Sequence, residues 1–174
     1  MGLVNAAIWL GAAVFFTVAV GPAFFSEAML KLFGGPSAQY SHAYAGMAAM
    51  VVIKRYFLCH HICGAIAILH GMAEAGYQGL PFKRFRNLLA VSIFAVGLAL
   101  GLLLQPHMGV WLETKYNPRL TSEARVAAAH SFSVWHGISQ VANLLMTGGL
   151  LVFFLKTAGA AGRDPKSNPF QFKS

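Results

Sequence analysis

Long apolar stretches separated by short polar segments dominate the sequence. A helix of about twenty residues crosses roughly 30 Å of hydrocarbon, so stretches of this length predict membrane-spanning helices. They cover about 3–32, 56–75, 87–112 and 126–156. Short connections between such helices favour an up-down arrangement. The pattern therefore predicts an all-α integral membrane protein. Residues 1–160 are expected to form a four-helix up-down transmembrane bundle, and 161–174 a polar C-terminal tail.

Glycine, proline and basic residues set the expected ends of these helices. The first helix is expected to end at Gly34-Gly35-Pro36-Ser37. The adjacent pair Lys54-Arg55 is costly at mid-membrane and is expected to mark an interface at the start of the second span.

Composition supports the membrane assignment. Of 174 residues, 57% are hydrophobic and 10% are charged, whereas soluble domains carry about 25% charged residues. The net charge of +8 comes from basic residues that lie between or beyond the apolar stretches. Such residues suit anionic headgroups, and no basic stripe with interleaved aromatics is present. The expected partner is the lipid bilayer, and nucleic-acid binding is excluded.

The basic residues also orient the bundle. Seven lie on the side of the termini: Lys83, Arg84, Arg86, Lys156, Arg163, Lys166 and Lys173. Six lie on the other side: Lys31, Lys54, Arg55, Lys115, Arg119 and Arg125. The positive-inside rule then places both termini in the cytoplasm, by a margin of one residue.

The fourth stretch carries polar side chains at spacings of three and four. At about 100° per residue they share one side of a helix; they are Ser133, His136, Ser139, Gln140, Asn143 and Thr147. Lipid does not satisfy such groups, so the stripe is expected to face the bundle interior or a cavity. It either joins helices through hydrogen bonds or belongs to a functional site. Leu150 is expected to face lipid.

The second stretch contributes imidazole and thiol groups. His60, Cys63 and His70 lie within about 80° of one another on a helix, and His61 is adjacent to them. These groups suit copper, zinc or haem iron. His60 and His61 fall in the same half of an up-down bundle as His136. We therefore predict a cofactor-binding set of His60, His61 and His136, and a metal-binding set of His60, Cys63 and His136. The alternative is that these residues only pack and form hydrogen bonds.

A family resemblance is carried by a motif in the fourth stretch, Phe132-x-x-x-His136-Gly137-Ile138-Ser139-x-x-x-Asn143-Leu144. It resembles the closing motif of the transmembrane protein 205 family and its bacterial relatives. Similar residues stand elsewhere in that family where this chain has Thr17-x-x-x-Gly21-x-x-x-Phe25, Tyr56-Phe57 and Pro106. The resemblance implies a small four-helix membrane protein, located in the inner membrane if the source is a bacterium. It implies no particular reaction. Of the predicted ligands, only His136 lies on the family motif.

Three functions follow from these patterns. The first is an intramembrane histidine site that binds haem b, or as second choice a copper ion, and serves electron transfer. The second is a transporter or channel for a small solute or metal ion along the polar stripe. The third is an accessory structural subunit of a larger membrane complex, packed through small residues such as Gly97-x-x-x-Gly101 and Gly148-Gly149. An enzyme is disfavoured because no nucleophile with an adjacent base is evident and carboxylates are scarce.

Overall fold

The computed structural model describes residues 2–79 and 81–161. Within that part every regular element is helical, which confirms the predicted all-α class. The elements are α1 (Gly2–Phe15), η1 (Phe16–Val20), α2 (Gly21–Phe24), α3 (Glu27–Leu32), α4 (Ser41–Gln78), α5 (Phe85–Leu98), η2 (Ala99–Leu104), α6 (Gln105–Tyr116) and α7 (Ser122–Ala161). Four helical stretches are long and apolar enough to cross a membrane: 2–24, 41–77, 85–116 and 122–160.

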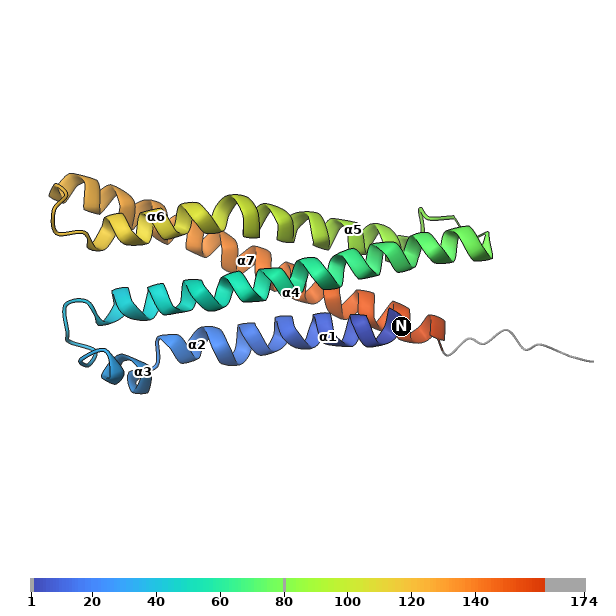
Figure 1. Cartoon of the computed structure of the whole chain (residues 1–174), viewed down its shortest axis with the longest axis horizontal. Helices are drawn as coiled ribbons and strands as arrows, with labels where there is room; N and C mark the ends of the chain where they lie inside the picture. Colours follow the sequence, from blue (N-terminus) through green and yellow to red (C-terminus); the bar gives the residue numbers. More distant parts are fainter. Residues whose placement is uncertain (1, 80, 162–174) are drawn as a thin grey trace, which may run out of the picture.

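These long helices lie side by side as an elongated bundle, and successive ones run in opposite directions along its axis (Figure 1). The α1–η1–α2 rod and the α5–η2–α6 rod each pack against both α4 and α7. The helices α4 and α7 therefore occupy opposite corners of the bundle. The first described residue and the last turns of α7 lie at the same end.

Two π-helical segments, η1 and η2, interrupt the first and third rods, and each precedes a proline. The Gly21 N–H donates to the carbonyl of Phe16, and the Gln105 N–H donates to that of Leu100, five residues back in both cases. Pro22 and Pro106 follow directly and have no N–H to donate. A missing donor leaves the carbonyl four residues earlier unpaired, so the local pattern shifts from α to π.

The first helix ends earlier than predicted. The rod stops at Phe24, and Ser26 is extended with ψ 153°. The Ser26 hydroxyl then accepts a hydrogen bond from the Met29 N–H at 3.3 Å and so begins the separate helix α3. A serine cap competes with continuation of the preceding helix. The single helix predicted for 3–32 is therefore wrong beyond Phe24.

The second helix is longer than its predicted span. The described helix α4 begins at Ser41 and continues without a break through Lys54 and Arg55, both exposed. At 1.5 Å per residue its 38 residues extend for about 57 Å. Gly79 ends it in the left-handed conformation, with φ 62°. The predicted tail, 161–174, lies outside the described residues from 162 onward.

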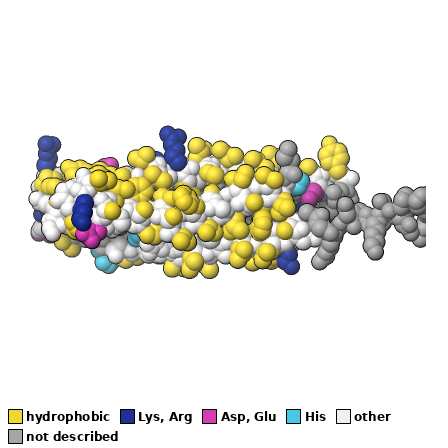
Figure 2. Space-filling view, turned by 90° about the horizontal axis from the view of Figure 1, so that it is seen from below, with side chains coloured by type: hydrophobic (Ala, Val, Ile, Leu, Met, Phe, Trp, Pro, Cys, Tyr) yellow, Lys and Arg dark blue, Asp and Glu magenta, His cyan; other side chains and the backbone are white. Residues whose placement is uncertain are grey.

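The surface and the core have unusual compositions for a bundle. Large apolar side chains are exposed along the whole length of the long helices, and charged ones are sparse on the face seen in Figure 2. The core contains Trp9 and the polar side chain of His60, each 1% exposed. Leu150 is fully buried beside them, so the prediction that it faces outward is wrong.

Candidate functional site

A hydrogen-bonded network joins three rods near the middle of the bundle. The Tyr56 hydroxyl on α4 donates to Oδ1 of Asn143 on α7 at 3.2 Å. The Asn143 amide nitrogen donates to Oγ1 of Thr17 on η1 at 2.7 Å, and Thr17 in turn donates to the Ala13 carbonyl at 2.8 Å. Phe16 stacks on the ring of Tyr56 with centroids 4.4 Å apart. Asn143 thus uses both ends of its amide to link α1–η1 to α4 across the bundle.

The ring of His60 is held by a second set of bonds next to this network. Trp9 Nε1 donates to His60 Nδ1 at 3.0 Å, and His60 Nε2 lies 3.4 Å from the Ile93 carbonyl. Because Nδ1 accepts from the indole, the ring proton belongs on Nε2, which donates to that carbonyl. His60 is therefore placed as a neutral histidine with both ring nitrogens engaged.

The adjacent His61 faces the third rod. Its Nε2 lies 3.3 Å from the carbonyl of Gly97 on α5. A Cβ at Gly97 would collide with the ring of His60, and one at Gly101 would come within 3 Å of Phe57. Gly97 and Gly101, two of the four glycines predicted to pack against partner chains, thus lie inside the bundle, where they admit aromatic and imidazole rings.

The predicted site residues Cys63 and His136 do not join this cluster. Cys63 is buried, and its carbonyl accepts a hydrogen bond from the Asn5 side chain at 2.9 Å. His136 is half-buried; its Nε2 lies 3.0 Å from the Gln140 amide nitrogen, and its ring stacks on Phe132. Among residues 2–79 and 81–161, no group of three His, Cys, Asp or Glu side chains is placed to hold a metal ion.

The Tyr56–Asn143 bond also gives a reference level for the positions of His60 and His136 along the bundle axis. The helices α4 and α7 run in the same direction, so His136 lies seven residues before the level of this bond and His60 lies four residues after it. Eleven residues correspond to about 16 Å along the axis. The bundle therefore separates His60 from His136 instead of presenting both to one ligand.

The predicted polar stripe of α7 divides into two faces. Asn143 is the member that bonds to other helices, while Ser139 and Thr147 bond to carbonyls of their own helix at 2.7 and 2.9 Å. Ser133 and Gln140 are exposed. Residues grouped by spacing alone therefore include some that face the bundle interior and some that face outward.

Sequence reasoning missed Asn5 and Trp9 as members of the buried polar set. Both stand one helical turn apart in an otherwise apolar stretch, and this spacing was the available signal. Thr17 and Tyr56 entered only through the family resemblance. The structure joins both of them to Asn143 through hydrogen bonds.

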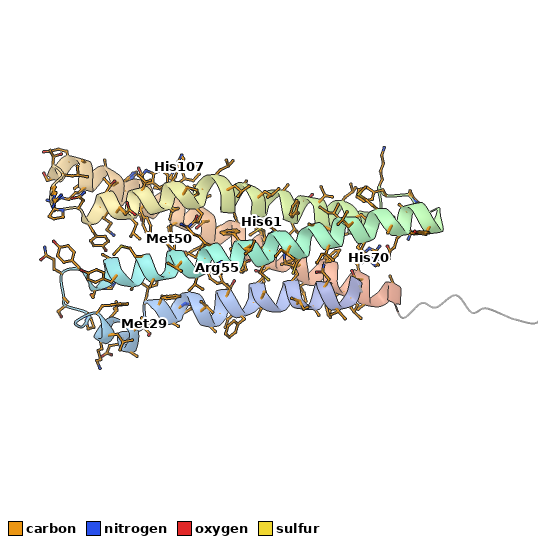
Figure 3. The ribbon with its side chains drawn as sticks, in the orientation of Figure 1. Met29, Met50, Arg55, His61, His70 and His107 are labelled. Carbon is orange, nitrogen blue, oxygen red and sulfur yellow. The ribbon has the colours of Figure 1, made fainter. Side chains whose placement is uncertain are left out.

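A charged cluster lies at the end of the bundle that holds His70 (Figure 3). Glu74 pairs with His70 at 3.3 Å and with the guanidinium of Arg86. Figure 3 places His61 between His107 and His70 along the bundle. These three histidines are therefore spread along the axis.

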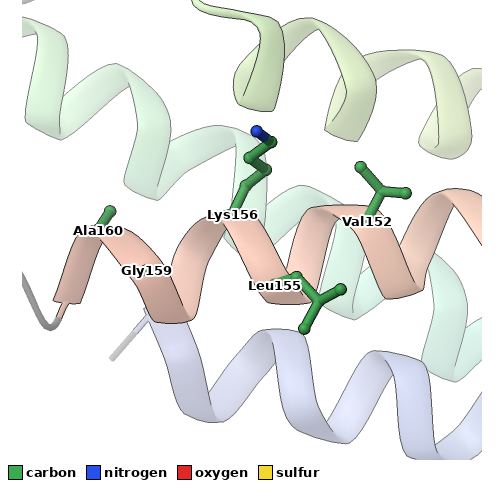
Figure 4. A pocket seen from close by; sticks show the side chains of 5 residues that line it. All are labelled: Val152, Leu155, Lys156, Gly159 and Ala160. Atoms are coloured by element: carbon green, nitrogen blue, oxygen red, sulfur yellow. The ribbon is translucent and has the colours of Figure 1, made fainter.

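Two hollows lie away from the polar network. One, of about 480 Å³, is lined by Val152, Leu155, Lys156, Gly159 and Ala160 near the end of α7 (Figure 4). Lys156 is its charged member. The other, of about 290 Å³, lies where α4 begins and α6 ends.

Comparisons with family models, with curated proteins and with solved structures find no match.

Proposed function

We propose that the chain is an integral membrane protein that crosses the bilayer four times in an up-down arrangement. Support comes from large apolar side chains that are exposed on each rod, such as Val18 at 72%, Leu103 at 69% and Leu145 at 71%. A soluble protein rarely exposes so much apolar surface, whereas lipid accepts it. The count of basic residues favours cytoplasmic termini. The family resemblance favours a bacterial inner membrane.

Within the membrane, we propose an accessory, assembly-forming role based on one face of α7. We call it the small-polar face and define it by Ser133, Gly137, Gln140, Leu144 and Gly148, all exposed. Successive members are three or four residues apart and fall within about 80° around the helix. This face points away from the three other rods, since the inner side of α7 carries Asn143, Met146 and Leu150.

The observation that carries this role is the exposed amide of Gln140. Its nitrogen lies near the His136 ring of the same helix, and the amide otherwise points outward. The His136 ring serves the amide nitrogen, and hydrocarbon offers no hydrogen-bond partner to the amide oxygen, so a second helix would satisfy it. No described atom beyond its own helix lies within 4 Å of a Cβ built at Gly137 or Gly148, so both sites leave room for a close helix approach.

The occupant that we propose is a second copy of this chain. A glutamine amide both donates and accepts, so two Gln140 side chains related by a two-fold axis satisfy each other. Ser133 and Gly137, four residues apart, form the small-residue spacing that allows two membrane helices to approach closely. The function is then that of a self-associating membrane scaffold, whose exposed apolar faces contact lipid or other subunits.

Disulfide crosslinking in membranes tests this proposal. In a background with Cys59→Ala and Cys63→Ala, a cysteine at Leu144 is expected to crosslink two copies. A cysteine at Leu145, equally exposed but about 100° away, is expected to stay monomeric. Gln140→Leu and Gly137→Leu should each reduce the Leu144 crosslink. Equal crosslinking at Leu144 and Leu145 would contradict contact between copies through the small-polar face. Co-purification of a different chain bound at this face would mean that the partner is that chain and not a second copy.

Electron transfer through haem b or a metal ion stays a prediction without structural support. His60 has both ring nitrogens engaged, and His136 stands about 16 Å away along the axis. An absorption spectrum with metal analysis of the purified protein tests it directly. If a Soret band or bound metal is present, His136→Ala should abolish it and His70→Ala should leave it intact.

Transport along the polar stripe is supported only if the chain self-associates. In one copy the stripe divides between Asn143 inside and Gln140 outside, so it does not line a single path. Solute uptake into proteoliposomes by the wild type, lost in an association-deficient variant, would favour a path between copies.

A further inference from the structure

The hollow where α4 begins and α6 ends has a lining suited to an organic cation. Three tyrosines, Tyr40, Tyr44 and Tyr116, are among its lining residues, together with Glu113. Its volume of about 290 Å³ lies close to the lower end of the roughly 300–1,000 Å³ range of small-molecule sites. We propose that this pocket, which we call the tyrosine pocket, binds the quaternary ammonium group of a choline-type ligand.

The two helices that form the pocket each contribute a pair of side chains. Tyr40 and Tyr44 are four residues apart around the start of α4, and Glu113 and Tyr116 are three apart in the last turns of α6. Residues at these spacings share a helix face. The two pairs therefore line the pocket from its two helices.

The pocket is closed on the side of the bundle by a tight contact between the same helices. A Cβ at Gly46 would lie 3.0 Å from a terminal carbon of Leu112, so α4 and α6 meet closely there. Tyr44 is 50% exposed, with Phe33 at 6.0 Å on one side of its ring. The aromatic surface of the pocket is thus reachable from outside the bundle.

Electrostatics favour a cation in this pocket. Glu113 has no ion-pair partner among the described residues. The ammonium of Lys115 lies 4.9 Å from the centroid of the Tyr116 ring and 5.8 Å from that of Phe132, and it is not part of the pocket lining. Aromatic faces attract cations through their quadrupole, and a carboxylate adds a full opposite charge.

The remaining lining is mostly apolar and favours a methylated ammonium over a primary one. Ala43, Met47, Leu112 and Pro118 are apolar, and Asn117 is the one polar residue among them. A primary ammonium carries three N–H donors that need acceptors, whereas a quaternary group has none and presents methyl groups. Methyl groups gain from apolar and aromatic contact, as in aromatic cages that bind choline or methylated lysine.

Calorimetric titration of the chain, purified in a maltoside detergent, tests the proposal with choline as the probe. We expect saturable binding, and at least about tenfold weaker binding of 3,3-dimethylbutan-1-ol, the neutral isostere of choline. Glu113→Gln and Tyr44→Leu should each weaken choline binding by about tenfold or more. Glu123→Gln, an exposed carboxylate at the start of α7, is the matched control and should bind as the wild type does.

A second arm distinguishes a soluble ligand from a lipid headgroup. The chain is reconstituted with phosphatidylcholine or with phosphatidylglycerol, and retained lipid is counted by native mass spectrometry. Selective retention of phosphatidylcholine, reduced in Glu113→Gln, would assign the pocket to a headgroup, and choline binding alone would assign it to a soluble ligand. Equal affinity for the neutral isostere, unchanged binding in Glu113→Gln, or binding of neither probe would overturn the proposal.

Discussion

The indole Nε1 of Trp9 lies 3.0 Å from Nδ1 of His60 and donates a hydrogen bond to it between two rods of the bundle. Both side chains are 1% exposed, so neither exchanges this partner for water. The bond fixes the tautomer of His60 and directs its Nε2 proton to the Ile93 carbonyl of a third rod. A buried imidazole here acts as a connector between helices.

Trp9→Phe is expected to destabilise the bundle more than its loss of volume explains. The substitution removes the donor and leaves Nδ1 of His60 buried without a partner, which costs about 1–3 kcal/mol. The thermal unfolding midpoint in detergent measures the effect. Trp135→Phe, at a side chain that is 42% exposed, is the control and should shift the midpoint little. Equal shifts in the two variants would show that the Trp9–His60 bond contributes nothing.

Gly97→Ala should also lower the unfolding midpoint, because the added methyl meets the His60 ring. Forcing a methyl group into a packed interior typically costs about 1–3 kcal/mol. Gly11→Ala provides the comparison, since no described atom beyond its own helix lies within 4 Å of the new methyl. There alanine should be neutral or stabilising because it favours the helix. A wild-type midpoint for Gly97→Ala would mean that the His60 ring has room to move.

The helices were predictable because their signal is local. Each long apolar stretch in the sequence corresponds to a helical rod, and Pro22 and Pro106 mark the places where the hydrogen-bond pattern changes. The break at Ser26 was not predicted, because apolar character continues on both sides of a single capping serine. The continuation of α4 through Lys54 and Arg55 was missed because charged residues limit lipid contact without ending a helix.

The site was less predictable because it depends on the register between helices. The spacing of polar residues on α7 predicts that they share one side of the helix. It does not predict that Asn143 faces the bundle interior and Gln140 the outside. Likewise, the periodicity of α4 places His60 on a face without naming Trp9 as its partner. Partner identity is set by tertiary packing, which no single-helix pattern contains.

Leu150→Ala is expected to be strongly destabilising, contrary to the outward position predicted from the sequence. Leu150 is fully buried against the core, and removing a buried leucine side chain costs about 2–5 kcal/mol. Leu145→Ala makes the same chemical change at a side chain that is 71% exposed and should leave stability nearly unchanged. Chemical denaturation of both variants in one detergent gives the comparison. If the order were reversed, the orientation of α7 would have to be revised.

Asn143→Leu should lower the stability of the single chain without removing its self-association. The substitution breaks the bonds to Tyr56 and to Thr17 at once, and interhelical hydrogen bonds in membranes average about 0.6 kcal/mol each, so a loss of about 1–2 kcal/mol is expected. A double-mutant cycle with Tyr56→Phe separates the network from general packing. If the Tyr56 hydroxyl acts through Asn143, the combined variant loses less stability than the two single losses added together.

Gln140→Leu is the matched change on the other face of α7 and should have the opposite signature. Its amide points outward, so the unfolding midpoint of the monomer should hold while crosslinking between copies falls. If the stability losses of Asn143→Leu and Tyr56→Phe simply add in the double variant, the hydrogen bond between the two side chains does not contribute to stability. A drop in monomer stability for Gln140→Leu as large as that for Asn143→Leu would mean that both residues face inward. Contact between copies through the small-polar face would then no longer explain the exposed half of the stripe.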